Sequence, residues 1–170
     1  MRGVCLDTCF LITLCSAARE RHAVARQFFQ YWIDNGYTLF LPTICYAEYL
    51  VVETSIQAYI LENVHLLPFD AESAILAGAI QRNRLPVEAE NTSRVAIKDD
   101  IKIIANAAHN HLLGIVTEDK DSMARYVRKA AETMAEVSGL KVLVLPDVFD
   151  EGSASFTDPQ LPLVYPPQTP

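Results

Sequence analysis

The sequence predicts an α/β fold in which a mostly parallel sheet is covered by helices on both faces. Short apolar runs of the kind found in buried strands alternate with longer segments whose apolar residues recur at helical spacing. Parallel strands need long crossover connections, which are usually helices, so this alternation favours a parallel sheet. The 170 residues are enough for one domain with a good core.

Five apolar segments are predicted to be the strands: residues 3–6, 39–41, 65–67, 114–117 and 142–145. Asp7 ends the first strand, and Asp119 and Asp121 come just after the fourth. In open parallel sheets, ligands bind outside the carboxyl ends of the strands. We therefore expect these acids to lie where such a fold places its chemistry.

Six segments are predicted to be helices: residues 8–17, 20–34, 43–62, 70 to about 82, 97–112 and 122–137. For residues 20–34 two buried faces fit the spacing, one with Val24, Phe28 and Tyr31 and the other with Ala25, Phe28, Phe29 and Trp32. The buried face expected for residues 43–62 consists of Ala47, Leu50, Val51, Ala58 and Leu61, with Glu48 beside it. In the next helix, which Asp70 caps, the buried face consists of Ile75, Leu76, Ala79 and Ile80.

The last two helices have the clearest helical periodicity. Their expected buried faces are Ile97, Ile101, Ile104, Ala105, Ala108 and Leu112, and then Met123, Tyr126, Val127, Ala130, Met134 and Val137. Residues 83–96 are polar and interrupted by proline, which predicts a mobile loop. Residues 1–148 are therefore predicted to form one domain, and residues 149–170, rich in Gly, Ser and Pro, a tail that contributes no core.

Composition limits the classes of function. Hydrophobic content of 51% and charged content of 21% are ordinary for a soluble globular chain, and no run reaches the length of a membrane helix. With Asp7 interrupting any signal-peptide core, we expect a cytoplasmic protein without a membrane partner. The four cysteines include no Cys-x-x-Cys pair and are expected to be free buried thiols. The net charge of −7 argues against nucleic-acid binding by bulk charge.

Acids at equivalent places in the chain suggest a metal site. Asp7, Glu48, Asp100 and Asp119 come from four separate segments, and four carboxylates in one small cleft would repel one another. A hard cation such as Mg²⁺ or Mn²⁺ prefers oxygen ligands and removes that conflict. Such a site can orient a water and neutralise charge on a phosphate, as phosphodiester hydrolysis requires.

Each acid taken alone has an ordinary structural explanation. Asp7 fits a strand-end turn and Glu48 fits a solvated helix residue. Asp100, like its neighbour Asp99, is favoured in a first helical turn by the helix dipole. Asp119 fits the N-cap of the helix that begins at residue 122. Only the joint pattern favours a functional site.

The ordered motifs resemble those of PIN-domain ribonucleases, including the VapC-like toxin group. They are Leu6-Asp7-Thr8 followed by Phe10-Leu11-Ile12, Pro42-x5-Glu48, Asp100-x4-Ala105-x-Ala107 and Thr117-x-Asp119-x-Asp121. The resemblance covers about residues 3–145. The resemblance implies a three-layer α/β/α fold with a five-stranded parallel sheet. It also implies an endoribonuclease that depends on Mg²⁺ or Mn²⁺ and acts on RNA.

The resemblance also implies roles for single residues. The family's four catalytic acids correspond to Asp7, Glu48, Asp100 and Asp119, and Asp100 is preferred to Asp99 because it keeps the family spacing to Ala105. The metal ligands among them are expected to be Asp7, Asp100 and Asp119, joined by Asp121. The supporting hydroxyls are Thr117 and, as a weaker candidate, Thr8. Apart from the resemblance, Lys98, Lys102 and Arg94 lie near these acids in the sequence and are candidates for contact with substrate phosphates, for which a solvated helix face is an equal alternative.

Three other functions were compared with the sequence: two kinds of phosphatase and a non-catalytic binding module. A haloacid-dehalogenase-type phosphatase needs a second Asp at position 9, where this chain has Cys9. Residues 15–21 fit the Cys-x5-Arg spacing of a cysteine phosphatase but lack the glycines of its phosphate loop. A non-catalytic PIN-like module that binds RNA or protein is the stronger alternative. A toxin would have an antitoxin partner that blocks the acidic cleft, for example with an Arg, and the resemblance also implies a homodimer.

Overall fold

The computed structural model describes residues 2–83 and 94–156, with side chains from residue 99 onward in the second segment. The strands are β1 (Gly3–Leu6), β2 (Thr38–Pro42), β3 (Val64–Leu67), β4 (Gly114–Thr117) and β5 (Lys141–Val144). The helices are α1 (Thr8–Cys15), α2 (His22–Asp34), α3 (Thr43–Val52), α4 (Ala58–Glu62), α5 (Ala71–Arg82), α6 (Arg94–His109), α7 (Met123–Ala131) and α8 (Glu151–Ala154). Among the described residues, no helix combines the length and apolar composition needed to span a bilayer.

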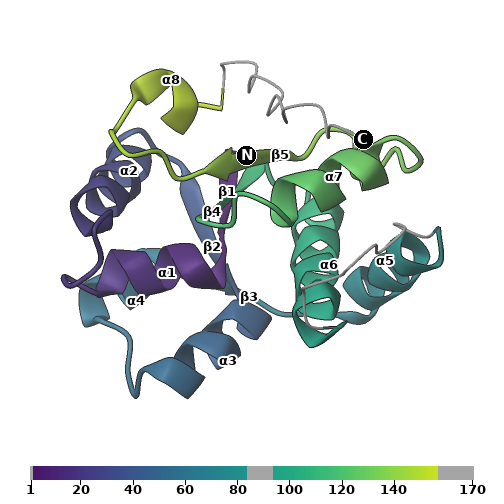
Figure 1. Ribbon diagram of the computed structural model, residues 1–170, viewed down its shortest axis with the longest axis horizontal. Coiled ribbons are helices and arrows are strands. Elements are labelled where there is room, and N and C mark those ends of the chain that lie inside the picture. The colour runs from purple at the N-terminus through teal and green to yellow at the C-terminus, as the bar shows by residue number, and fades with distance from the viewer. Residues whose placement is uncertain (1, 84–93, 157–170) are drawn as a thin grey trace, which may run out of the picture.

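The five strands form one parallel sheet in the order β3-β2-β1-β4-β5. Figure 1 shows α1, α2 and α4 on one side of it and α5, α6 and α7 on the other, which makes three layers. This confirms the predicted fold class and the five predicted strands to within a residue or two at each end. The strand order changes direction between β1 and β4, and such a switch point is where parallel sheets open a ligand crevice.

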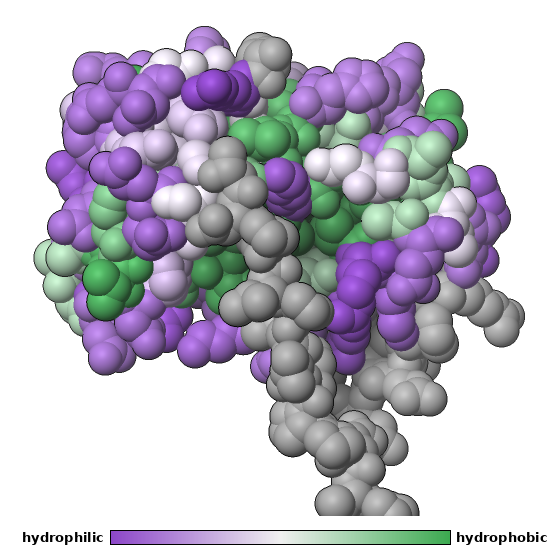
Figure 2. All heavy atoms as spheres, turned by 90° about the horizontal axis from the view of Figure 1, so that it is seen from above, coloured by the Kyte–Doolittle hydropathy of each residue, from purple (hydrophilic) through white to green (hydrophobic). Residues whose placement is uncertain are grey.

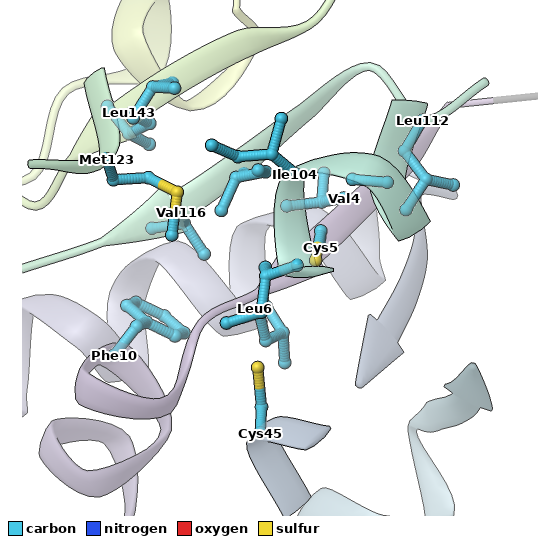
Figure 3. Close-up of a cluster of buried hydrophobic side chains, with 14 of the residues drawn as sticks. Val4, Cys5, Leu6, Phe10, Cys45, Ile104, Leu112, Val116, Met123 and Leu143 are labelled. Atoms are coloured by element: carbon cyan, nitrogen blue, oxygen red, sulfur yellow. The ribbon is translucent and has the colours of Figure 1, made fainter. Parts of the chain in front are cut away.

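The central strand β1 is buried on both faces. Val4, Cys5 and Leu6 have no solvent exposure, as expected for a parallel strand covered by two helical layers. Figure 3 shows Cys45 of α3 pointing toward Leu6, and Met123 of α7 lying beside Val116 of β4. Since β1 and β4 pair in parallel with Leu6 opposite Val116, their carboxyl ends lie side by side.

The structure decides between the two faces proposed for the second helix. In α2 the buried residues are Ala25, Phe28, Phe29 and Trp32, so the second alternative is confirmed. All six residues predicted to be buried from 123 to 137 are indeed buried. Helix α7 itself ends at Ala131 rather than at residue 137, and the remaining residues continue in turns that still cover the core.

The prediction of one continuous helix over residues 43–62 is wrong. The chain leaves helical geometry at Glu53, and α4 begins only at Ala58. The predicted buried face is also wrong, because Leu50, Val51 and Leu61 are exposed, as are Ala47 and Ala58. The buried side chains are Cys45, Tyr49 and Ile60. Val51, Val52 and Thr54 are weak helix formers at the point where the helix stops, so propensity allows the break.

The helices on the other face differ from the prediction in smaller ways. Asp70 caps α5 by accepting a hydrogen bond from the Ser73 N–H at 2.8 Å, as predicted, but Ile75 is 71% exposed and not part of the buried face. Helix α6 begins at Arg94, three residues before the predicted start at residue 97. The predicted mobile loop therefore overlaps this helix, and its residues 84–93 lie outside the described part of the chain.

The first residues of the predicted tail contribute to the core, contrary to expectation. Ala154 and Phe156 are buried, and the Trp32 indole N–H donates to the Ala154 carbonyl oxygen at 2.8 Å. The Phe156 ring lies so close to Gly114 that a Cβ there would come within 2.4 Å of Cε1. Composition could not show that α8 and Phe156 dock on α2 and β4. The division at residue 148 stays a prediction, and residues 157–170 lie outside the described residues.

The surface seen from above in the orientation of Figure 1 is mixed. Figure 2 shows hydrophilic residues over most of its outline and smaller patches of apolar residues nearer its centre. Scattered apolar exposure of this kind is normal for a folded chain.

Candidate functional site

A pocket of about 440 Å³ opens at the carboxyl ends of β1 and β4, between α1, α3 and α6. One part of its lining is acidic and consists of Asp7, Glu48, Asp100 and Asp119. The rest is formed by Thr8 and Cys9 and by the apolar side chains Ile12, Val51, Val52 and Ile103. The four predicted catalytic acids thus face one pocket, although they are spread over more than a hundred residues of sequence.

Asp7 lies deepest and is 6% exposed. Its Oδ2 accepts hydrogen bonds from the Thr117 hydroxyl at 2.6 Å and from the Cys9 thiol at 2.8 Å. The Thr117 Oγ1 in turn accepts from the Asp119 N–H at 2.9 Å. Burial raises the pKa of Asp7; the hydrogen bonds from Cys9 and Thr117 counteract part of this rise, and the charge of Asp119 adds to it. Thr117 thereby links the two acids that follow β1 and β4.

Glu48 reaches the pocket from the second half of α3. Its Oε2 accepts a hydrogen bond from the Thr8 hydroxyl, which belongs to the first turn of α1. Burial raises the pKa of Glu48; the Thr8 bond opposes this, while the charges of Asp99 and Asp7 reinforce it. Thr8, the weaker of the two predicted supporting hydroxyls, therefore holds Glu48 of α3 in place.

Asp119 and Asp100 share one hydroxyl. The Ser122 Oγ lies 2.9 Å from Asp100 Oδ2 and is also hydrogen-bonded to Asp119 Oδ2. Asp119 Oδ1 accepts from the backbone N–H groups of Asp121 at 2.8 Å and Ser122 at 3.0 Å. Burial by itself would raise the pKa of Asp119, but these hydrogen bonds outweigh it and hold the pKa below its usual value. This loop orients Asp119 as a carboxylate.

The surroundings of Asp100 disfavour its ionised form and raise its pKa well above the usual value. Burial raises its pKa to about 7, against a bond from Ser122 that lowers it, and the charges of Asp7, Asp119 and Glu48 add to the rise. A cation bound among these oxygens would stabilise the ionised form and so offset the effects of burial and of the neighbouring charges. The donor set is therefore chemically suited to a hard divalent cation.

The side chains do not stand at ligand distances from a common point. Within residues 2–83 and 99–156, no group of three or more His, Cys, Asp or Glu side chains is arranged to hold a metal ion. The carboxylates instead bond to Thr8, Thr117, Cys9 and Ser122. Binding a metal would require these carboxylates to exchange some of those hydrogen bonds for metal ligation.

Several predicted residues lie outside the pocket lining. The Asp121 side chain is exposed, and its described contact with the site is through its backbone N–H to Asp119. Lys102 pairs with Asp99 at 2.7 Å, three residues earlier on α6. Helix α6 also carries Arg94 and Lys98, whose side chains lie outside the described residues.

Two residues whose side chains contact the pocket acids, Cys9 and Ser122, were not among the predicted site residues. The Cys9 Sγ lies 2.8 Å from Asp7 Oδ2 and 3.1 Å from Thr117 Oγ1, and it accepts from the Glu118 N–H at 3.0 Å. The Ser122 hydroxyl was missed because serine before a helix usually indicates only an N-cap. The sequence predicts Cys9 only as one of four free buried thiols. Its position two residues after Asp7, at the start of α1, was the signal available in the sequence.

Comparisons with known proteins identify the fold. No protein-family model and no curated protein matches the sequence. Among solved structures, a chain of VapBC2 from Rickettsia felis, bound to a DNA fragment from its promoter, aligns with a TM-score of 0.56 and 16% identity over 72% of this chain and 92% of that one. A chain of DNA-bound VapBC from Salmonella typhimurium aligns with a TM-score of 0.54 and 18% identity, over 84% of this chain and 97% of that one. The order of strands, the acidic pocket at the switch point and these similarities agree: the chain has the PIN-like three-layer α/β/α fold.

Proposed function

We propose that this protein is a metal-dependent endoribonuclease that hydrolyses RNA phosphodiester bonds in the acidic pocket. The observation that carries the proposal is the convergence of four carboxylates, from the ends of β1 and β4 and from α3 and α6, on one pocket of about 440 Å³. A structural role for each acid does not explain why all four line the same space. Burial raises the pKa of Asp100 to about 7, and the charges of Asp7, Asp119 and Glu48 add to the rise.

Asp7, Asp100 and Asp119 are the residues that would hold Mg²⁺ or Mn²⁺, with Asp121 as a further predicted ligand. When bound, the cation would neutralise charge on a phosphate and lower the pKa of a water. Thr117 donates to Asp7 Oδ2, which holds that carboxyl in place and favours its ionised form against the effect of burial. Glu48, held by Thr8, lies across the pocket, where it can accept a proton or orient a water.

Contacts with the rest of the substrate would come from α6 and from the apolar side chains of α3 that line the pocket. Lys102, Lys98 and Arg94 lie on the helix that carries Asp100, and these cations would meet phosphates beside the scissile bond. Lys102 would first have to leave Asp99. The exposed side chains Val51 and Val52 offer an apolar surface next to the acids.

RNA cleavage by the purified protein tests the proposal. Wild type should cleave a mixed RNA pool with Mn²⁺ or Mg²⁺ and not with EDTA, and Asp100→Asn and Asp7→Asn should each lower the rate on the order of 100-fold or more. Asp34→Asn is a matched control, because Asp34 is exposed at the end of α2. Equal cleavage by wild type and both pocket variants would reject the proposal.

We further propose that an antitoxin protein is a partner. The two similar structures are VapBC complexes bound to DNA, and the pocket here gathers acidic side chains that a basic residue of such a partner could neutralise. Co-purification with the product of an adjacent short reading frame, and loss of RNA cleavage in that complex, would support this. Cleavage that is unaffected by every neighbouring gene product would favour a nuclease without an antitoxin.

A non-catalytic PIN-like module is the alternative. It is favoured by one observation, namely that the described carboxylates bond to hydroxyl and thiol groups and not in a ligand arrangement. Calorimetric titration with Mn²⁺ separates the two functions. A module without a metal site should show no saturable binding, whereas the nuclease should bind Mn²⁺ and lose that binding in Asp100→Asn.

A further inference from the structure

Ser122 occupies an unusual place for a residue at a helix start. It is the N-cap of α7, yet its side chain makes no capping hydrogen bond. An N-cap serine ordinarily uses its oxygen to accept an N–H of the first helical turn. Here the side chain, 6% exposed, points its hydroxyl toward two carboxylates of the pocket.

The two carboxylates come from different parts of the fold. Asp100 belongs to α6, and Asp119 belongs to the loop that follows β4. Ser122 is hydrogen-bonded to both carboxylate oxygens of Asp119. Its backbone N–H donates to Oδ1 at 3.0 Å, and its hydroxyl is hydrogen-bonded to Oδ2. The same hydroxyl lies 2.9 Å from Asp100 Oδ2, and among the described side chains no other hydrogen-bond donor contacts Asp100.

This arrangement sets the separation of the two acids. Two ionised carboxylates on separate elements would move apart, because nothing else in the described pocket joins them. The Ser122 hydroxyl has a single proton, which it can share between the two carboxylates or donate to one at a time, and its position within hydrogen-bond distance of both keeps one oxygen of each on the same side of the pocket. Groups that orient ligands in this way strongly influence the affinity of a metal site.

We propose that Ser122 is a positioning residue that presents Asp100 and Asp119 together to one divalent cation. The inference rests on the proposed function only in taking these two acids as cation ligands. It does not depend on the substrate being RNA.

The test measures Mn²⁺ binding by isothermal titration calorimetry, without RNA. Ser122→Ala should weaken binding by about 10-fold. Ser122→Cys, which fills the space but is a weak donor, should behave like Ala and provides a folded variant if Ala leaves a damaging void. Ser122→Thr, which keeps the hydroxyl, should stay within about threefold of wild type. Ser138→Ala is the matched control, because Ser138 is exposed and its hydroxyl bonds locally to the Ala135 carbonyl.

A double-mutant cycle with Asp100→Asn shows whether Ser122 acts through the acids. Ser122→Ala should have little further effect on Mn²⁺ affinity once Asp100 is changed. In RNA cleavage it should lower kcat and leave KM within about twofold. Mn²⁺ affinity of Ser122→Ala close to that of wild type, or equal losses in the Thr and Ala variants, would overturn the proposal. If wild type binds Mn²⁺ but cleaves no RNA, the ribonuclease proposal fails while the role of Ser122 is still decided.

Discussion

Single residues in the pocket are balanced between burial, which opposes their charge, and hydrogen bonds, which support it. Asp119 receives several donors, and its pKa is lowered. Asp100 receives one, and its pKa is raised to about 7 by burial and by the neighbouring acids. Two carboxylates in one pocket thus have opposite pKa shifts because of their local donors.

The raised pKa of Asp100 predicts how stability depends on pH. Since its folded pKa lies above the unfolded value of 3.8, the folded state binds more protons between pH 4 and 7. The contribution of Asp100 is therefore present at low pH and becomes unfavourable as pH rises through about 7. In EDTA, Asp100→Asn should be more stable than wild type at pH 8, and the difference should shrink toward pH 5.

Urea denaturation at several pH values, with Asp34→Asn as the control, measures this difference. Saturating Mn²⁺ should reverse the order at pH 8, because the cation stabilises only a folded protein that keeps its carboxylate. A difference between Asp100→Asn and wild type that does not change with pH would contradict the assignment.

A second residue-scale prediction concerns Cys9. Its thiol contacts Asp7, Thr117 and the Glu118 N–H, so Cys9→Ala should leave the Glu118 N–H and the Asp7 carboxylate each short of a partner. We expect a loss of about 1 kcal/mol in the free energy of unfolding. Cys9→Ser, which keeps a donor and an acceptor, should lose less. Chemical denaturation compares the variants, and equal losses for Ser and Ala would show that these hydrogen bonds do not matter.

At the scale of elements, the docking of α8 makes a testable difference. Phe156 is 3% exposed, lies against Gly114 of β4 and stacks with Trp32 of α2 at 6.4 Å between ring centroids. Phe156→Ala should therefore cost about 3 kcal/mol of stability. Thermal and urea unfolding measure this cost. A loss below about 1 kcal/mol would mean that residues 150–156 contribute little to the fold in solution.

Elements also show where periodicity was sufficient and where it failed. Helix α2 was recognisable from its apolar spacing, and Trp32 and its neighbours are buried as one of the two predicted faces requires. The prediction for residues 43–62 fails because the apolar residues Leu50, Val51 and Leu61 lie on the surface. Helical spacing reports which residues share a face, but not which face meets the core.

For the whole molecule, charge predicts how RNA would be recognised. With a net charge of −7, the protein should not bind RNA by general attraction to phosphates. Filter binding in EDTA should show no saturable binding at micromolar protein, and binding should appear when a divalent cation is supplied to a cleavage-impaired Glu48→Gln variant. Tight, salt-sensitive binding in EDTA would point instead to a basic surface. Glu62→Gln, an exposed acid on α4, is the matched control.

The homodimer stays a prediction at this scale, and light scattering on the purified chain tests it.

Leu50, Val51 and Val52 expose apolar surface at the end of α3, with Val51 85% exposed. Val51→Asp should therefore change the free energy of unfolding by less than about 0.5 kcal/mol. A larger loss of stability would show that Val51 is buried in solution, as it would be at an interface between copies.

The class of fold, the five strands, most of the buried helix faces and the four acids that line the pocket could be predicted from the order of residues alone. These follow from local patterns, because strand and helix periodicity and the placement of acids after strands are written along the chain. The folded structure was needed to show that Cys9 and Ser122 contact those acids, that α3 ends at Val52, and that Phe156 completes the core. Those facts depend on distances between segments far apart in sequence, such as Ser122 and Asp100 or Phe156 and Trp32. Contacts of that kind form only when the whole chain packs.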